Sequence, residues 1–145
     1  MGGVLDGMAE LPAHPDVAPA VGSLRAAGVR VFALTNGSEK NTHTLLKSAG
    51  LLDSVDRIVS IDEAGQWKPR PEVYRYAAQV AGVEPARMAL VAAHAWDCHG
   101  AHRAGLVTGW VRRTELRFSP ALDPPDVQGN DLVAVYDAML RLPSP

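Results

Sequence analysis

The sequence predicts an α/β fold, a Rossmann-like parallel sheet with flanking helices. Short apolar runs of β-type residues alternate with longer segments of helical periodicity, and Gly or Pro residues separate many of them. The runs are not joined by hairpin turns, so we expect βαβ crossovers and parallel strands. Three polar motifs each follow an apolar run, at the carboxyl ends where such sheets bind ligands.

Five segments have the start and stop signals of helices. The first opens at Pro15-Asp16 and has Val17, Ala20, Val21 and Leu24 on one face before Gly28 stops it. In the second, Ser38 is placed to cap the N-terminus. The predicted helices cover residues 15–27, 38–49, 71–81, 97–104 and 131–140.

Four apolar runs have the length and composition of strands. They cover residues 29–34, 57–61, 88–93 and 106–111. Residues 1–11 are rich in glycine and show no strand pattern, and a Pro-rich loop covers residues 119–125.

Composition restricts the classes of partner. The 145 residues are 47% hydrophobic and 21% charged, which fits one globular domain with a real core. A net charge of −2 gives no basic surface for nucleic acid, and the apolar runs are too short for a bilayer span. We therefore expect no nucleic-acid or membrane partner. The single cysteine, Cys98, cannot form an internal disulfide, so we expect a reducing, cytoplasmic setting.

The first motif, Leu34-Thr35-Asn36-Gly37-Ser38, joins a strand to a helix N-terminus. Gly37 permits a tight turn, and the amides beyond it can hold an anion. Thr35 offers a hydroxyl, and Asn36 offers both a donor and an acceptor. The alternative is a plain Asn-Gly turn followed by the Ser38 cap, and this motif alone favours that alternative.

The second motif is Trp67-Lys68-Pro69, with Tyr74 about one turn into the next helix. Pro69 and Pro71 stiffen the backbone around Lys68, which can aim its ammonium into a site as a fixed cation. The alternatives are a solvated loop lysine and a tyrosine that only packs beside its apolar neighbours.

The third motif, Val91-Ala92-Ala93-His94-Ala95-Trp96-Asp97, follows the most apolar run. Asp97 falls in the first turn of the next helix, where a capping or dipole-stabilised role is one interpretation. The other is a carboxylate that pairs with Lys68 or orients an attacking water. His94 is suited to holding a substrate group or assisting that water.

We predict no catalytic or metal-binding role for the other histidines of this helix or for its cysteine. His99 and His102 are three residues apart, but no Cys or acidic residue completes a recognisable ligand set. We therefore interpret both as surface histidines and expect no metal. Cys98 is interpreted as a small buried apolar residue rather than a nucleophile.

In this order, the three motifs resemble those of the haloacid dehalogenase superfamily, and in particular its 2-haloacid dehalogenase type. The resemblance runs from His14-Pro15-Asp16-Val17 to Arg113 and includes Gly100-Ala101 after the third motif. It implies that residues 14–145 form the α/β core of the family. Residues 1–13 would be the remnant of the connection from cap to core.

In enzymes of this type, a strand-end aspartate attacks the carbon that carries the halogen, and water then hydrolyses the ester. The resemblance implies catalytic roles for Thr35, Lys68, Tyr74 and Asp97. Thr35 would lie in the loop that binds the substrate carboxylate and the nucleophile. Lys68 would pair with the nucleophile near Tyr74, and Asp97 would position Lys68 and the hydrolytic water.

The resemblance also implies substrate-binding roles, which fall to Asn36, Gly37, His94 and Trp96. His94 stands where such dehalogenases often have Asn, and Ala92 where serine is common. Phosphatases of the superfamily carry an acidic Mg²⁺ ligand at the position of Ala93. Because Mg²⁺ prefers carboxylate oxygens, this position favours the metal-independent branch, and no cofactor is expected.

The largest departure from the family lies upstream of His14. The strand that carries the nucleophile is central in the family's sheet, between the strands that end at Thr35 and Ala93, and no such strand is found here. Asp6 follows no apolar strand, so it is not interpreted as the nucleophile. We expect a truncated chain with negligible turnover alone. Without this strand, its two neighbours would have open edges. Three explanations stay open: the two halves pair directly, a partner chain donates a strand, or the reading frame is truncated.

The predicted function is a haloacid dehalogenase-like hydrolase whose substrate is a 2-halo carboxylate or a similar small anion. Two alternatives stay open. One is a non-catalytic anion-binding or assembly module, with a homodimer as one form. The other is a phosphatase of the same superfamily. The predicted site requires the side chains of Thr35, Lys68 and Asp97 to lie together at one edge of the sheet.

Overall fold

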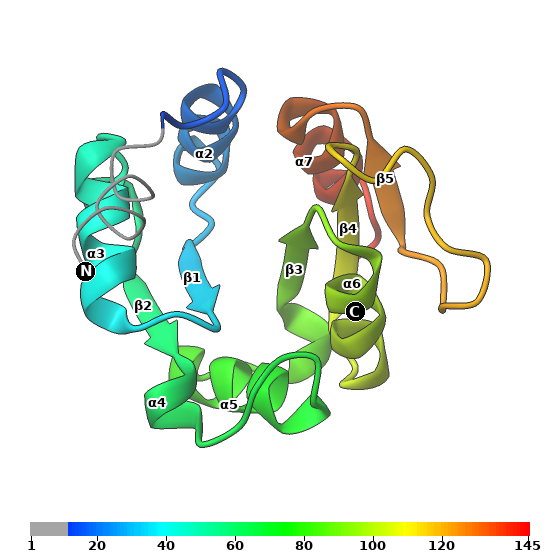
Figure 1. Ribbon diagram of the computed structural model, residues 1–145. Helices are drawn as coiled ribbons and strands as arrows, with labels where there is room; N and C mark the ends of the chain where they lie inside the picture. The colour runs from blue at the N-terminus through cyan, green and yellow to red at the C-terminus, as the bar shows by residue number, and fades with distance from the viewer. Residues whose placement is uncertain (1–11) are drawn as a thin grey trace. The chain divides into compact units, whose positions relative to one another are not determined.

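The structure, a computed structural model, describes residues 12–145 (Figure 1). The chain divides into two compact units with their boundary between Glu63 and Ala64, and each is described by itself. The predicted α/β class is confirmed, because each strand pair among these residues is parallel and helices alternate with the strands. Asp6 lies outside the described residues, and the domain boundary after residue 13 stays a prediction.

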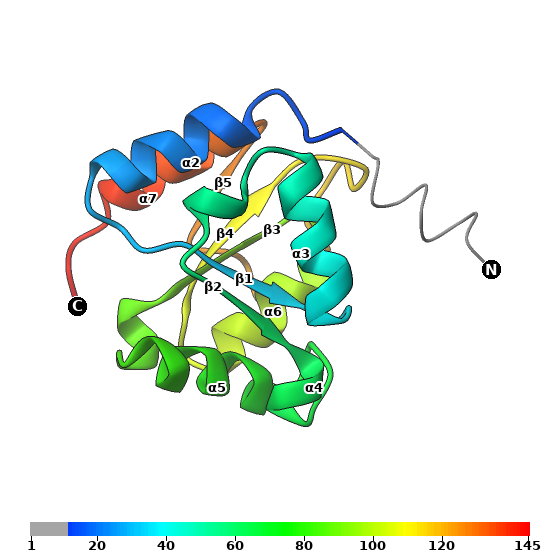
Figure 2. The same cartoon turned by 90° about the vertical axis from the view of Figure 1, so that its left-hand side faces the viewer.

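The first unit contains a two-stranded ladder of β1 and β2. Its elements are α2 (Val17–Ala26), β1 (Phe32–Thr35), α3 (Glu39–Ser48), the short 3₁₀ helix η1 (Leu52–Ser54), β2 (Arg57–Ser60) and the start of α4 (Ile61–Ala64). Figure 2 shows β1 and β2 side by side, with Thr35 opposite Ser60 in the register. The predicted Ser38 cap is confirmed, since its Oγ accepts a hydrogen bond from the Asn41 N–H at 3.1 Å.

Strand β1 begins at Phe32, three residues later than the apolar pattern predicts. The cause is Asp56, whose Oδ2 accepts a hydrogen bond from the Val31 N–H at 2.7 Å. The Asp56 N–H in turn donates to the Val31 carbonyl oxygen at 2.7 Å. Arg25 Nη1 also contacts Asp56 Oδ2 at 2.7 Å, so one carboxylate joins the end of α2 to both strands.

These contacts make the first unit sensitive to acid. The Val31 N–H, and next the Arg25 guanidinium, lower the pKa of Asp56 below its ordinary value of 3.8. Because the folded pKa is the lower one, the stabilisation is complete above the unfolded value and is lost as pH falls through the folded pKa. We expect Asp56→Asn to cost the first unit about 1 kcal/mol at pH 7 and to flatten its acid dependence.

Far-UV circular dichroism and amide exchange in β1 and β2, at pH 7 and pH 3, measure this effect. Tryptophan fluorescence does not, because Trp67, Trp96 and Trp110 all lie in the second unit. Asp53→Asn, at an exposed position of the same unit, is the matched control. Equal acid sensitivity of Asp56→Asn and the unsubstituted chain would contradict the prediction.

The second unit contains a three-stranded parallel ladder in the order β3-β4-β5. Its elements are α5 (Pro71–Ala81), the short 3₁₀ helix η2 (Pro85–Arg87), β3 (Ala89–Ala92), α6 (Ala95–Arg103), β4 (Val107–Val111), β5 (Val127–Gly129) and α7 (Leu132–Leu140). Helix α6 packs on β3 and β4, α7 packs on β4 and β5, and α5 packs beside α6 (Figure 1). Most of the buried apolar side chains belong to this unit, among them Val73, Tyr74, Trp110 and Val135.

Strand β5 is the strand that the sequence pattern does not predict. It has only three residues and no apolar run, yet Gln128 lies opposite Trp110 in β4. Asp126, just before β5, fixes the pairing because its Oδ2 accepts from the Thr108 N–H at 2.8 Å. Its own N–H donates to the Thr108 carbonyl oxygen at 3.0 Å.

Within residues 12–145, β1 pairs only with β2, and β3 pairs only with β4. Each is therefore an edge strand of its own ladder, with one row of backbone groups outside any ladder pairing. The predicted absence of a central strand before the first motif stays a prediction, because residues 1–11 lie outside the described range. None of the described helices has the length and hydropathy that crossing a membrane requires.

Candidate active site

The chemistry-bearing side chains of the second unit meet at Asp97, in the first turn of α6. Its Oδ2 accepts a hydrogen bond from Lys68 Nζ at 2.6 Å, and its Oδ1 accepts one from the Tyr74 hydroxyl at 2.6 Å. The Lys68 and Asp97 side chains are only 11% and 6% exposed. An ammonium and a carboxylate that are both this buried form a tightly held charge pair.

Local sequence explains how these residues reach Asp97. Lys68 precedes Pro69, and Tyr74 sits in the first turn of α5, which Pro71 opens. Gly100 lies one turn beyond Asp97 in α6, and an added Cβ there would be 2.6 Å from the Pro69 carbonyl oxygen. The missing side chain lets this loop and Tyr74 lie against the helix.

The environment keeps the Tyr74 phenol neutral. Burial first, and then the hydrogen bond to Asp97, raise the pKa of Tyr74 far above its ordinary value of 10.0. The hydroxyl is therefore a donor to Asp97 and not a base. Asp97 has both oxygens occupied, so its contacts suit it to holding Lys68 rather than to nucleophilic attack.

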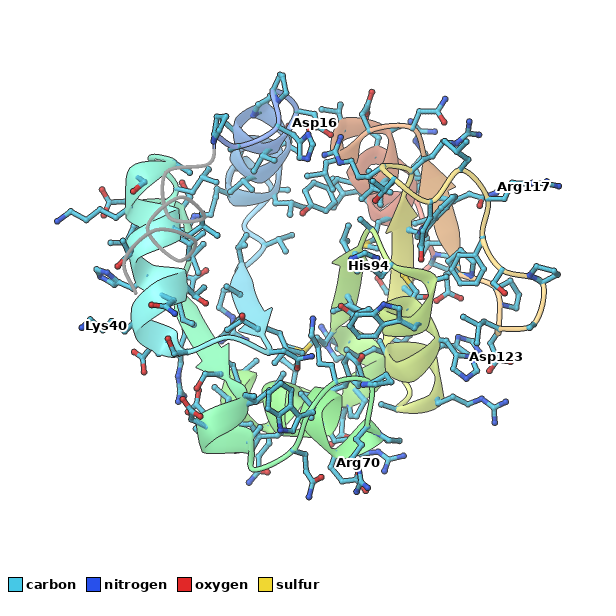
Figure 3. All side chains as sticks on the ribbon, in the orientation of Figure 1. Asp16, Lys40, Arg70, His94, Arg117 and Asp123 are labelled. Atoms are coloured by element: carbon cyan, nitrogen blue, oxygen red, sulfur yellow. The ribbon has the colours of Figure 1, made fainter. Side chains whose placement is uncertain are left out.

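His94 and Trp96 lie beside this pair. Their rings stack with centroids 5.6 Å apart and an interplanar angle of 14°. Lys68 Nζ is 5.9 Å from the Trp96 ring centroid, within reach of a cation–π interaction. Trp96 is 38% exposed, and Figure 3 marks His94 at the end of β3. This arrangement offers a partly open aromatic wall next to a cation.

Two residues that the sequence interpretation missed hold the turn between β3 and α6. Glu115 Oε2 accepts a hydrogen bond from the Ala95 N–H at 2.8 Å, and Glu115 Oε1 is 3.7 Å from His94 Nδ1. The Trp110 Nε1–H donates to the Ala93 carbonyl oxygen at 3.0 Å. No local pattern marks Glu115, because its partners lie about 20 residues upstream.

Thr35, Asn36 and Gly37 belong to the first unit, so their predicted convergence with Lys68 and Asp97 stays a prediction. The Thr35 Oγ1 at the end of β1 accepts a hydrogen bond from the Gly37 N–H at 2.9 Å. Gly37 is not among the glycines with positive φ. Its small size matters for another reason, because an added Cβ would lie 3.2 Å from Thr35 Oγ1.

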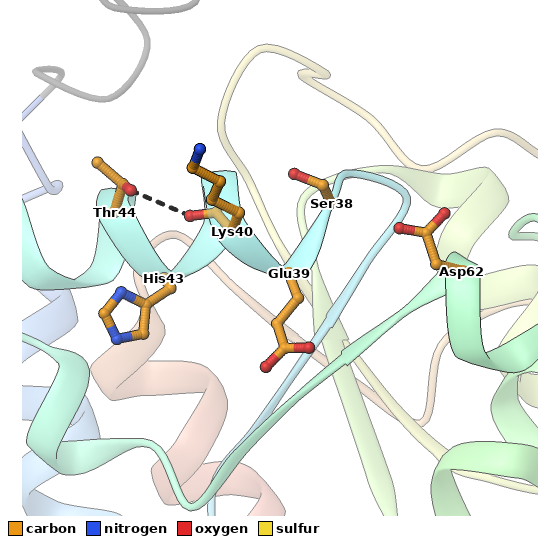
Figure 4. A pocket seen from close by; sticks show the side chains of 6 residues that line it. All are labelled: Ser38, Glu39, Lys40, His43, Thr44 and Asp62. Atoms are coloured by element: carbon orange, nitrogen blue, oxygen red, sulfur yellow. Dashed lines mark hydrogen bonds between the residues drawn. The ribbon is translucent and has the colours of Figure 1, made fainter.

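An open hollow of about 630 Å³ lies in the first unit near the start of α3 (Figure 4). It is lined by Ser38, Glu39, Lys40, His43, Thr44 and Asp62. Its charges are of both signs, and neither Thr35 nor Asn36 lines it. The hollow therefore offers no selective anion pocket, and it is not the site that the motifs predict.

His99 is partly exposed, so its interpretation as a surface histidine holds in part, but it is not a free side chain. Its Nδ1 accepts a hydrogen bond from the Asp123 N–H at 3.0 Å. Arg103 Nε contacts Asp123 Oδ2 at 2.6 Å, so these residues hold the Pro-rich loop on α6. Figure 3 labels Asp123 in this loop. His102 is exposed, as predicted. In the described part of the chain, no three His, Cys, Asp or Glu side chains gather in a way that could hold a metal ion.

Cys98 is buried, as predicted, and its Sγ lies 3.5 Å from the Gly109 carbonyl oxygen. Burial, and next the negative charge of Asp97, raise the pKa of Cys98 to about 12. Since only the thiolate attacks disulfide reagents, we expect the folded chain to react with Ellman's reagent at pH 8 at least about 100-fold more slowly than the unfolded chain. Comparable rates with and without guanidinium would contradict this prediction.

Comparisons with known proteins identify the family of this chain. A family model described as a haloacid dehalogenase-like hydrolase matches residues 2–105. The (S)-2-haloacid dehalogenase 1 of Pseudomonas sp. (strain CBS-3) is 32% identical over 139 residues, which are 96% of this chain and 61% of that protein.

Two solved structures share the fold. The L-2-haloacid dehalogenase RSc1362 superposes with a TM-score of 0.85 and 28% identity, over 91% of this chain and 58% of that one. A HAD phosphatase from Thermococcus onnurineus gives 0.78 and 26% identity, over 88% and 58%. The chain thus spans less than two thirds of the length of these proteins. With the family model matching well over half of its residues, this chain belongs to the haloacid dehalogenase-like hydrolases.

Proposed function

We propose that this chain supplies the lysine-bearing part of a hydrolytic site that breaks the carbon–halogen bond of 2-halo carboxylates. The observation that carries the proposal is the buried ammonium of Lys68, held at 2.6 Å by Asp97, whose other oxygen is held by Tyr74. The similarity to proteins named 2-haloacid dehalogenases supports the substrate class.

In the proposed reaction, a carboxylate oxygen attacks C2 of the substrate, and the halide leaves with the electron pair of the broken bond. Water then hydrolyses the ester, which restores the carboxylate and yields a 2-hydroxy acid and a proton. Lys68 stabilises the attacking carboxylate and the substrate anion. Asp97 orients Lys68 and the hydrolytic water, and no metal or cofactor takes part.

The attacking group must be a carboxylate other than Asp97. Both Asp97 oxygens accept hydrogen bonds, and the side chain is 6% exposed, so a substrate carbon has no approach to it. We therefore propose that the 145-residue chain alone turns over negligibly. In this proposal Thr35 is catalytic, while Asn36 and Gly37 bind the substrate.

His94 and Trp96 form the remaining substrate-binding wall in this proposal. The partly open indole beside Lys68 suits the halogen and the apolar substituent of the substrate, because both are weakly hydrated. The ammonium suits the carboxylate.

Binding and halide release by the 145-residue chain test the proposal together. We expect (S)-2-chloropropionate and the product-like anion lactate to shift the Trp96 indole signal in ¹⁵N spectra, and Lys68→Met to abolish the shift. Lys47→Met, at an exposed position of α3, is the matched control. No shift with either anion would contradict the proposed function.

Chloride release is measured in the same samples, and we expect none above the background of Lys68→Ala. Release that Lys68→Ala abolishes would overturn the proposed inactivity of the chain alone, and Asp6→Asn would then show whether Asp6 attacks. Mg²⁺-dependent hydrolysis of p-nitrophenyl phosphate would instead favour a phosphatase. Ala93 opposes that function, because it offers no carboxylate to the metal.

The second candidate function is a non-catalytic assembly module. It is favoured by the edge positions of β1 and β3, since open edges pair readily with other chains. Stable homodimers in sedimentation experiments, without turnover, would support it. A monomer with no response to carboxylates would count against it.

A single buried cysteine further supports our proposal of a reducing, cytoplasmic setting.

A further inference from the structure

The turn between β3 and α6 carries the two residues of the aromatic wall, and its geometry is held from outside. His94 is the N-cap residue of α6, but its side chain makes no capping hydrogen bond. The first amide of the helix, the Ala95 N–H, is bound instead by Glu115 at 2.8 Å. The helix N-terminus thus depends on a side chain from the loop that follows β4.

Glu115 also faces the wall itself. Its second oxygen, Oε1, is 3.7 Å from His94 Nδ1, and the His94 ring stacks on Trp96, which lies over Lys68. His94 and Glu115 are about half and one third exposed, so solvent screens this contact and it is weak. One carboxylate therefore contacts both the backbone and the ring of this turn.

From this geometry we infer that Glu115 is a positioning residue, which fixes the His94 and Trp96 rings beside Lys68 for substrate binding. The inference rests on the proposed function, in which these rings contact the substrate. Glu115 contacts His94 and the Ala95 amide, and it acts on the site through them. The hydrogen bond from the Trp110 Nε1–H to the Ala93 carbonyl oxygen holds the other side of the turn.

Two substitutions separate capping from positioning. Glu115→Ala removes both contacts, whereas Glu115→Gln retains an oxygen for the Ala95 N–H and loses the charge that faces His94. Glu84→Gln, an exposed glutamate of the same unit with no capping bond, is the matched control. If Glu115 only capped the helix, Glu115→Gln would restore every property of the unsubstituted chain.

The direct readout is spectroscopic. We expect nuclear Overhauser contacts between the His94 and Trp96 rings in the unsubstituted chain and in Glu84→Gln. These contacts and the ring-current shifts of His94 should weaken in Glu115→Gln and vanish in Glu115→Ala. Unfolding curves followed by tryptophan fluorescence are the control that each variant is folded. Unchanged ring contacts in folded Glu115→Ala would overturn the inference, as would full restoration by Glu115→Gln.

Titration with (S)-2-chloropropionate connects the inference to function. We expect the affinity to fall about 3-fold to 10-fold in Glu115→Ala, as for loss of one weak positioning contact. An unchanged affinity with displaced rings would overturn the role in binding. If the unsubstituted chain binds no carboxylate, the proposed function fails, while the ring contacts still decide whether Glu115 positions His94.

Discussion

Replacing Asp97 with alanine is expected to lower the free energy of unfolding of the second unit by about 3–5 kcal/mol. Asp97 is the common acceptor of the Lys68 ammonium and the Tyr74 hydroxyl, both at 2.6 Å. With the carboxylate gone, a cation with an 11% exposed side chain loses this partner in a place where water replaces it poorly. The buried phenol loses its acceptor as well, and unsatisfied buried groups are costly.

Urea unfolding followed by tryptophan fluorescence measures this loss, because all three tryptophans report on the second unit. Asp137→Ala, at an exposed position of α7, is the control and should stay within about 0.5 kcal/mol of the unsubstituted chain. Asp97→Asn should fall between the two, since the amide oxygen still accepts from Tyr74. A change below about 1 kcal/mol in Asp97→Ala would contradict the view of Asp97 as a structural and functional centre.

Signals that lie within a few residues of each other predicted the elements well. The Ser38 cap, the apolar face of α2, and the span of α5 from Pro71 to Gly82 all depend on local rules of capping, periodicity and backbone conformation. Gly82 has φ of 71°, the left-handed conformation that ends a helix. Such rules act before any tertiary contact is formed, so the sequence shows them directly.

Contacts between distant side chains and backbone amides could not be predicted in the same way. Asp56 shortens β1 through the Val31 N–H, Asp126 creates the pairing of β5 through Thr108, and Glu115 starts α6 two residues early. In each case one carboxylate binds an amide 18 to 25 residues away. Nothing near these acids distinguishes them from solvated surface residues.

The candidate site also contains residues that the sequence could predict and residues that it could not. Lys68 and Tyr74 reach Asp97 from the loop after α4 and from α5, and no strand of the β3-β4-β5 ladder precedes them in the chain. Asp97 follows the carboxyl end of β3, and parallel pairing brings the carboxyl ends of one ladder to the same edge. That rule applies only to strands of the same sheet. Thr35 ends a strand of the other ladder, so the geometry of one rim does not extend to it and its role depends on the experiments proposed above.

Replacing Gly100 with alanine is expected to destabilise the second unit by about 1–3 kcal/mol, although alanine is the better helix former. A Cβ at this position would lie 2.6 Å from the Pro69 carbonyl oxygen, 2.7 Å from the Pro69 Cβ and 2.9 Å from Cε2 of Tyr74. These distances are far inside van der Waals contact, and two of the three neighbours belong to a proline in the loop that carries Lys68. Relief of the clash must therefore move the loop or the Tyr74 ring away from α6.

The matched control is Gly22→Ala in α2, where an added Cβ meets no atom within 4 Å. There the helix propensity acts alone, and we expect a gain of up to about 1 kcal/mol, measured by circular dichroism because the first unit contains no tryptophan. In Gly100→Ala, the displaced ring should also weaken the hydrogen bond from Tyr74 to Asp97, visible as a changed near-ultraviolet dichroism spectrum. A Gly100→Ala chain as stable as the unsubstituted one, with an unchanged spectrum, would show that the loop can yield without disturbing Lys68 and Asp97. Opposite signs for the same substitution in two helices would establish that close approach, and not helix propensity, requires glycine beside this pair.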